Sequence, residues 1–98
     1  MNRPEIEWDE AKNTSNKRKH GISFREAVTV FADEHGLLLA DPEHSTKEDR
    51  FVLLGFSASL QILIVCHCYR RSEETIRIIS ARKATKSERA VYNKRWRK

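Results

Sequence analysis

Hydrophobic residues follow a helical spacing early in the chain and a strand-like spacing later. Phe24, Ala27, Val28 and Phe31 recur so that they fall on one side of a helix. From residue 50 onward, apolar residues alternate with polar ones or form short continuous runs, as they do in strands. The pattern therefore predicts helices first and a sheet afterwards.

A helix without an apolar face precedes that one. Asp9 is a suitable N-cap for a helix over residues 10–20, and Gly21 follows where a left-handed residue commonly ends a helix. Polar side chains fall near one stripe of this helix at helical spacing: Lys12, Asn16, Lys19 and His20. A stripe of this kind is either solvated or functional.

Two capping boxes mark the starts of the other helices. In a capping box the N-cap hydroxyl and a carboxylate three residues later each accept from the other residue's backbone N–H. Ser23 with Glu26 opens the second helix, which we expect to stop between residues 33 and 36. Thr85 with Glu88 opens a C-terminal helix that continues through residue 92 toward residue 96.

Five segments have the patterns of strands. We expect a short first strand around Ile6 and Trp8 and a second over residues 37–40. Three longer strands follow, over residues 50–56, 60–69 and 75–81. Their short connections imply antiparallel hairpins, and the middle strand is apolar on both faces, which places it at the centre. The predicted fold is α+β in one domain over residues 1–98, with two N-terminal helices, an antiparallel meander and a C-terminal helix.

Charge is segregated along the chain, whose net charge is +5. Residues 69–98 contain 11 basic and 3 acidic residues, whereas the first 68 residues contain 8 basic and 11 acidic ones. A cationic segment raises the local concentration of polyanions, which favours a nucleic acid as the partner. The alternative is a solvated basic surface without a polyanionic ligand.

Neither a membrane segment nor a metal site is expected. The most apolar run covers only residues 60–66, too short to span a bilayer, so we expect a cytoplasmic protein with no membrane partner. Cys66 and Cys68 lie two residues apart in a strand, too close in sequence for a disulfide, and we expect them reduced. His67 between them points to the opposite face, which is poor ligand geometry, so no metal or cofactor is expected.

Three stretches match a known pattern in order and over nearly the whole chain. They are Glu-Trp-Asp-Glu-Ala-Lys at residues 7–12 with Asn16 and Lys-His-Gly at 19–21, Ser-Phe-Arg-Glu-Ala at 23–27, and Ile-Arg-Ile-Ile-Ser-Ala-Arg-Lys-Ala at 76–84 with Glu88 and Tyr92 after it. In these motifs the chain resembles the BrnT family of bacterial toxins. The resemblance implies a RelE-like fold and a metal-independent endoribonuclease that inhibits translation and growth by cleaving RNA. It also implies a type II toxin–antitoxin system, with a cognate BrnA-like ribbon-helix-helix antitoxin and homodimerisation of the toxin in their complex.

The candidate phosphate-binding residues are arginines. RNA carries its own nucleophile, so a metal-free nuclease needs a base for the 2′-OH, cations for the phosphorane and an acid for the leaving oxygen. Arg77 and Arg82, on and just after the last strand, are the expected phosphate clamp because a guanidinium donates two parallel hydrogen bonds. An ion pair with Glu88 or a solvated edge is the alternative. Arg50 and Arg70 form a second cluster, expected to bind RNA.

Other residues are candidates for proton transfer or for RNA binding. Lys12 and His20 are candidate acids or bases, because histidine changes charge nearest neutral pH and lysine does so when cationic neighbours lower its pKa. Lys19 and Lys83 are expected to bind RNA. Tyr92 either points into the site as an acid or fills the core with its ring. A non-catalytic nucleic-acid-binding or interaction module remains the alternative function, since the same basic surface would serve it.

Overall fold

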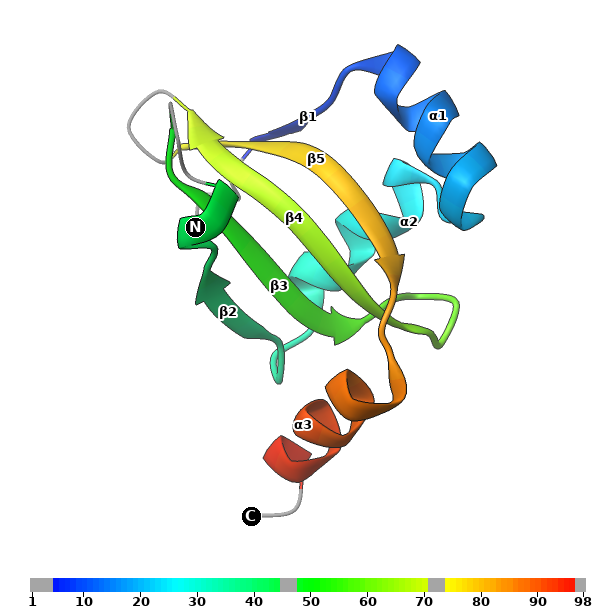
Figure 1. The fold of residues 1–98 in the computed structure, drawn as a ribbon, viewed down its shortest axis with the longest axis vertical. Coiled ribbons are helices and arrows are strands. Elements are labelled where there is room, and N and C mark those ends of the chain that lie inside the picture. Colours follow the sequence, from blue (N-terminus) through cyan, green and yellow to red (C-terminus); the bar gives the residue numbers. More distant parts are fainter. Residues whose placement is uncertain (1–4, 45–47, 71–73, 97–98) are drawn as a thin grey trace.

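A five-stranded sheet forms the centre of the computed structural model, which describes residues 5–44, 48–70 and 74–96 (Figure 1). The order of the strands across the sheet is β1-β5-β4-β3-β2. The elements are β1 (Glu5–Glu7), α1 (Glu10–His20), α2 (Phe24–Thr29), β2 (Leu37–Ala40), β3 (Arg50–Phe56), β4 (Ile62–Arg70), β5 (Thr75–Lys83) and α3 (Lys86–Trp96), with single 3₁₀ turns at Val30–Ala32 and Pro42–His44. None of the helices in these ranges is long and apolar enough to cross a membrane.

The sheet is mixed, whereas the sequence predicted an antiparallel one. The predicted α+β class and the β3-β4-β5 meander are confirmed, and β2 joins β3 antiparallel. The correction concerns β1, which pairs parallel with β5 and places Ile6 opposite Ile76. Parallel strands need a long connection, and here α1, α2 and three strands separate the two partners in sequence. A strand of three residues carries no signal for such a distant partner.

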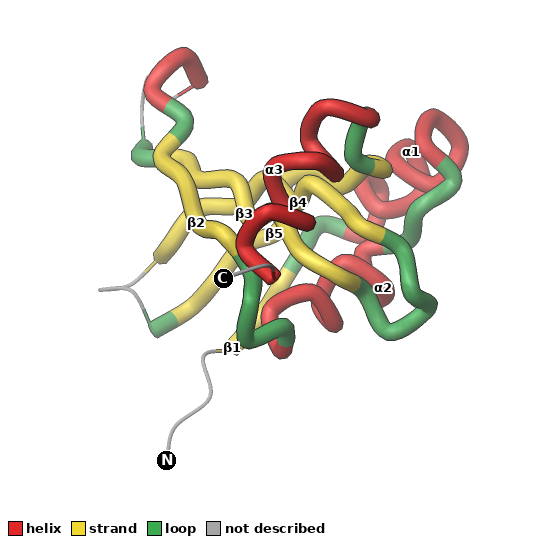
Figure 2. The backbone as a smooth tube through the Cα atoms, turned by 90° about the horizontal axis from the view of Figure 1, so that it is seen from below, coloured by secondary structure: helices red, strands yellow, loops and turns green. Residues whose placement is uncertain are grey.

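Two apolar clusters lie on opposite faces of the sheet. Leu53 and Leu63 belong to the larger cluster, which α2 covers, whereas their neighbours Leu54 and Ile64 belong to the cluster beneath α3. Successive side chains of a strand point to opposite faces, so α2 and α3 cover different sides, as Figure 2 shows from below. The face opposite α2 is only partly covered, and we call it the open face.

Helix α1 is anchored to β5 by one amide side chain. Asn16 is buried, and its Nδ2 donates to the carbonyl oxygens of Ile22 at 2.9 Å and Ala81 at 2.8 Å. Its Oδ1 accepts from the backbone N–H of Ala81 at 3.1 Å. Because β1 pairs only with the first three residues of β5, this amide takes the place of a neighbouring strand farther along. Asn16 is therefore structural, a role that the polar stripe on this helix did not indicate.

The predicted helix caps are confirmed with one exception. Asp9 accepts from the N–H of Ala11, and Gly21 ends α1 with φ of 73°. Ser23 accepts from the N–H of Glu26, as the first capping box requires. The carboxylate of Glu26, however, accepts from side chains of the β3–β4 loop, Ser57, Ser59 and Gln61, because these hydroxyl and amide donors converge on it.

Candidate functional site

Cross-strand register arranges the open face in rows. Residues that lie opposite one another on neighbouring strands project from the same side of a sheet. From β5 toward the far edge, the rows read Arg77-Cys68-Arg50, then Ser80-Cys66-Val52, then Arg82-Ile64-Leu54. Glu7 of β1 extends the first row next to Arg77. Basic side chains therefore stand on both β5 and β3, with β4 between them.

A bulge in β5 brings Arg77 and Arg82 to the same face. They are five positions apart, an odd offset, so a regular strand would point them to opposite sides. The register with β4 shifts at this point, since Cys66 lies opposite Ser80 and His67 opposite Ile78, which leaves Ile79 as an extra residue. The extra residue shifts the alternation of side chains by one position, so Arg77 and Arg82 project from the same face of the sheet.

A pocket of about 250 Å³ lies between the basic residues of β3 and β5. Arg50 and Arg82 line it from opposite sides of β4, and Asp41 contributes one carboxylate. Its other lining residues are apolar or uncharged: Val52, Ile64, Cys66, Ile79 and Ser80. Two guanidiniums around a small hollow are suited to bind a phosphate.

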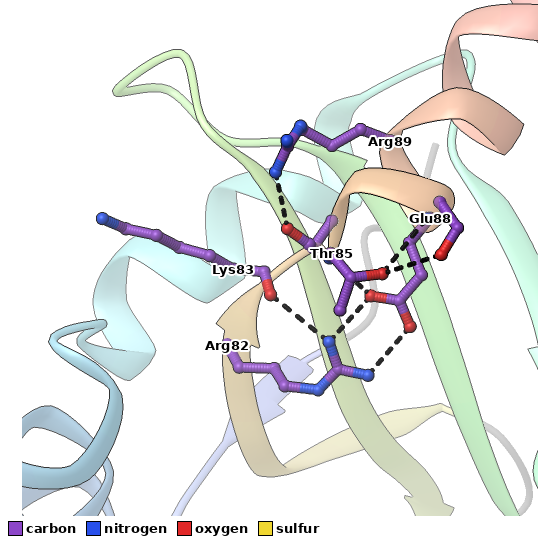
Figure 3. Close-up of polar contacts among 7 residues, drawn as sticks. Arg82, Lys83, Thr85, Glu88 and Arg89 are labelled. Carbon is purple, nitrogen blue, oxygen red and sulfur yellow. Dashed lines mark hydrogen bonds and ion pairs between the residues drawn. The ribbon is translucent and has the colours of Figure 1, made fainter.

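Arg82 is oriented by a bidentate ion pair. Its Nη1 donates to Oε1 of Glu88 at 2.8 Å and its Nη2 to Oε2 at 2.9 Å, so the two planar groups face each other (Figure 3). Hydrogen bonds from Arg82, together with the backbone N–H of Thr85, lower the pKa of Glu88 to about 2 despite partial burial. The ion pair considered as an alternative for Arg82 is thus present. Within the described part of the chain, its Nε–H forms no hydrogen bond.

The two predicted arginine clusters merge into one. Arg77 donates to Glu7 at 2.8 Å, and Arg70 lies 4.0 Å from the same carboxylate. A hydrogen bond from Cys68 lowers the pKa of Glu48, against a small effect of burial. The charges of Arg70, Arg50 and Arg77 lower it further, so this carboxylate lies near all three arginines. Sequence reasoning missed both glutamates, because neither the parallel register of β1 nor the position of residue 48 leaves a local signal.

The basic residues of α1 and the end of β5 lie apart from this group. Lys12 and Lys19 are exposed and His20 is half-buried, and none of them forms a hydrogen bond or ion pair with another residue of the described ranges. Lys83 is exposed, and Figure 3 shows it extending away from Arg82 and Glu88. The structure therefore joins four of the predicted site residues, Arg50, Arg70, Arg77 and Arg82. The side chains of Lys12, Lys19, His20 and Lys83 lie outside their contacts, although the backbone carbonyl of Lys83 accepts from Arg82 at 3.3 Å.

Tyr92 belongs to the core and we remove it from the candidate catalytic residues. Its side chain is 1% exposed, and its hydroxyl donates to Oδ2 of Asp33 at 2.6 Å. Its ring packs edge-on against Phe56, with the centroids 6.0 Å apart. Of the two interpretations of this tyrosine, the core is the one that the structure supports. One turn farther along α3, Arg95 donates to the carbonyl oxygens of His35 and Gly36 and fixes the helix end.

Neither cysteine is poised as a nucleophile. Both are free thiols; Cys66 is half-buried in the pocket wall and Cys68 is buried. Burial raises the pKa of both thiols, and the Glu48 carboxylate helps to raise that of Cys68 to about 11. Both are therefore protonated at neutral pH. Among the described residues, no group of three or more His, Cys, Asp or Glu side chains is arranged to hold a metal ion.

Comparisons with known proteins identify a relative with the same fold. A crystal structure of the Brucella abortus ribonuclease toxin BrnT superposes with a TM-score of 0.62 at 28% sequence identity. The match covers 86% of this chain and 100% of that one. No curated protein sequence matches the chain at a significant level. The profile of a family described as the ribonuclease toxin BrnT of type II toxin–antitoxin systems matches residues 8–88. The chain thus belongs to the BrnT family of ribonuclease toxins of type II toxin–antitoxin systems.

Proposed function

We propose that the open face binds the RNA backbone and that cleavage proceeds without a metal, with the 2′-OH of the RNA as nucleophile. The observation that carries this proposal is the pocket flanked by Arg50 and Arg82. These two guanidiniums would stabilise the charge that develops on the phosphorane, which is the task a metal would otherwise perform. Loss of RNA by this route would inhibit translation and growth, and we propose that the chain acts in the cytoplasm.

Arg82 is proposed as the principal phosphate ligand. Glu88 uses one N–H of each terminal nitrogen and the carbonyl oxygen of Lys83 accepts the other N–H of Nη1, so the Nε–H and the second hydrogen of Nη2 are left for a phosphate. A guanidinium already held in one orientation loses little freedom when the phosphate arrives. Arg50 faces it across β4, and Arg77 lies on the same face beyond the bulge.

Proton transfer is proposed for α1. Asn16 seats this helix against the outer edge of β5, the strand that carries Arg77 and Arg82. An RNA strand that leaves the open face across this edge passes α1, where Lys12 and His20 would act as acid or base and Lys19 would bind the backbone. Because these α1 residues lie apart from the arginines of the open face, this assignment requires one RNA strand to contact both α1 and the open face.

The antitoxin is proposed to cover the open face. Membership of a type II system implies a cognate antitoxin and an RNA substrate. A ribbon-helix-helix protein of the BrnA type, with acidic side chains facing the arginines, would neutralise the toxin by charge complementarity and exclusion of RNA. Two copies of the toxin in one complex are expected from the resemblance.

The decisive experiment is RNA cleavage by the purified chain in excess EDTA, with mapping of the product ends. We expect cleavage to persist and to leave 2′,3′-cyclic phosphates, because the 2′-OH attacks the adjacent phosphorus. The double variant Arg50→Ala/Arg82→Ala should lose it, while Arg18→Ala on the exposed side of α1 should not. Activity that disappears with EDTA and returns with magnesium would refute the mechanism. RNA that is bound with a steep salt dependence but never shortened would establish the non-catalytic alternative.

A further inference from the structure

A second pocket lies at the β3–β4 hairpin and shares no lining residue with the first. Its volume is about 270 Å³. Its apolar wall comes from both strands of the hairpin, the loop between them and the segment before α3: Phe56, Leu60, Ile62 and Ala84. Its polar groups are Gln61, Lys83 and Arg89. Concave, mostly apolar sites with a few convergent polar groups are typical of small-ligand binding.

Leu60 adopts an unfavourable conformation at the rim of this pocket. Its φ is 66°, in the left-handed region that favours glycine, and its side chain is 78% exposed. The loop holds it there, because the N–H of Leu60 donates to Ser57 at 3.0 Å and the N–H of Ser57 donates to Gln61 at 2.8 Å. Backbone strain of this kind clusters at ligand sites, and a ligand that covers the leucine would bury an apolar surface that is now in water.

Two cations stand beside the apolar wall. Arg89 is fixed by a hydrogen bond from Nη1 to the carbonyl oxygen of Ala84 at 3.0 Å. Lys83 follows Arg82 directly on β5, and its side chain extends from the strand in the direction away from that of Arg82, as Figure 3 shows. A ligand with a flat apolar part and an anionic part matches this arrangement, and a nucleotide has both.

Gln61 offers the base a hydrogen-bond acceptor. Its Nε2 donates to Oε2 of Glu26 at 3.0 Å and to Ser59 at 3.3 Å, which fixes the orientation of the amide. The group that it can still offer is its carbonyl oxygen, an acceptor. A base that satisfies this oxygen must donate a hydrogen, as the exocyclic amino groups of adenine, cytosine and guanine and the ring N3–H of uracil can do.

We infer that this pocket is a nucleobase subsite, in which Gln61 accepts a hydrogen bond from the base, next to the phosphate held by Arg82. The inference rests on the proposed function, because it takes the RNA on the open face as its starting point. Lys83 and Arg89 bind the phosphate of that nucleotide, and the hairpin supplies the stacking surface.

The test is a titration of the isotope-labelled full-length chain with adenosine 5′-monophosphate, followed by backbone amide NMR. The comparison ligand is purine riboside 5′-monophosphate, which has the same shape without the amino group. We expect adenosine monophosphate to shift the amides of residues 60–62, 84 and 89, and the comparison ligand to bind about three- to tenfold more weakly, the effect of one hydrogen bond. Lys83→Ala/Arg89→Ala should weaken binding of adenosine monophosphate, whereas Lys86→Ala, exposed on the same helix, should not.

Three outcomes would overturn the inference. Equal affinity for the two nucleotides would exclude the amino-group contact, and shifts confined to residues around Arg50 and Arg82 would place the nucleotide elsewhere. Shifts at the pocket with the cognate antitoxin but not with adenosine monophosphate would make it a protein-docking site. Each of these results is obtained without cleavage, so the proposed function is judged separately by the EDTA experiment.

Discussion

Glu88 caps α3 and orients Arg82 with the same carboxylate. Its Oε1 accepts from the backbone N–H of Thr85 at 2.8 Å and from Nη1 of Arg82 at 2.8 Å, while Oε2 accepts from Nη2 at 2.9 Å. The first turn of α3 and the guanidinium on the open face are therefore coupled through one side chain. Any change at residue 88 should alter both the stability of the chain and the behaviour of the site.

Glu88→Gln should reduce the loss of stability in acid. The pKa of Glu88 is about 2 in the folded chain and 4.5 ordinarily, so its stabilisation is complete above pH 4.5 and is lost as the pH falls toward 2. Glutamine keeps the capping box but does not titrate. Because the side chains of Arg82 and Glu88 are 41% and 31% exposed, we expect a difference of about 1 kcal/mol at most.

Urea denaturation at pH 5, 3 and 2, followed by circular dichroism, measures this difference. Glu34→Gln is the control, since Glu34 is exposed and forms no hydrogen bond within the described ranges. Parallel pH curves for Glu88→Gln and the parent would contradict the assigned role of the ion pair.

Arg82→Ala should lower the cleavage rate far more than it lowers RNA affinity. Removal of one preorganised stabiliser of the transition state typically costs about a hundredfold, or about 3 kcal/mol. Arg82→Lys should keep most of the defect, because lysine retains the charge but loses the planar fork. Single-turnover cleavage and a separate binding titration resolve the two effects, with Arg18→Ala as the matched control. A folded Arg82→Ala variant that cuts RNA at the parental rate would move the site to α1.

Asn16→Ala should destabilise the chain by about 2–3 kcal/mol. The substitution leaves the N–H and the carbonyl oxygen of Ala81 without partners beside α1, and buried unpaired backbone groups are costly. Ser15→Ala is the control, because Ser15 is the exposed neighbour on the same helix. The measurement is the free energy of unfolding in urea. A loss below about 0.5 kcal/mol would show that α1 does not depend on this amide.

His67→Phe should flatten the pH dependence of stability just below neutrality. His67 is fully buried against the rings of Phe31, Phe51 and Tyr69, and its Nε2 has no hydrogen-bond partner among the described residues. Burial lowers its pKa from 6.5, so the unfolded chain takes up the proton first and stability falls as the pH drops below 6.5. Phenylalanine cannot titrate and packs in the same ring cluster.

Unfolding free energies at pH 7.5, 6.5 and 5.5 provide the test for His67. We expect the parent to lose stability over this interval and the variant to lose less, with equal or greater stability at pH 7.5. His20→Gln on the surface of α1 is the control. An unchanged slope in His67→Phe would mean that this histidine does not contribute.

Local signals predicted the helices well and the sheet in part. The caps at Asp9, Gly21 and Thr85 lie where the sequence placed them, because a cap is made by residues only a few positions apart. The hairpins of β3, β4 and β5 followed from short connections. The partner of β1 did not, since its hydrogen bonds reach residues 75–77 across most of the chain.

The sequence by itself determined which residue types could serve the site, and the tertiary structure decided which of them share a surface. The two arginines of β5 were predicted as phosphate ligands from their chemistry alone, and that role is still a proposal. Their common face depends on the extra residue Ile79, which is set by hydrogen bonding to β4 and leaves no pattern in β5 itself. The ion pair of Arg77 with Glu7 likewise requires the parallel register. Caps and alternation are local properties of the chain, whereas register is a property of two strands together, and so only the folded sheet fixes it.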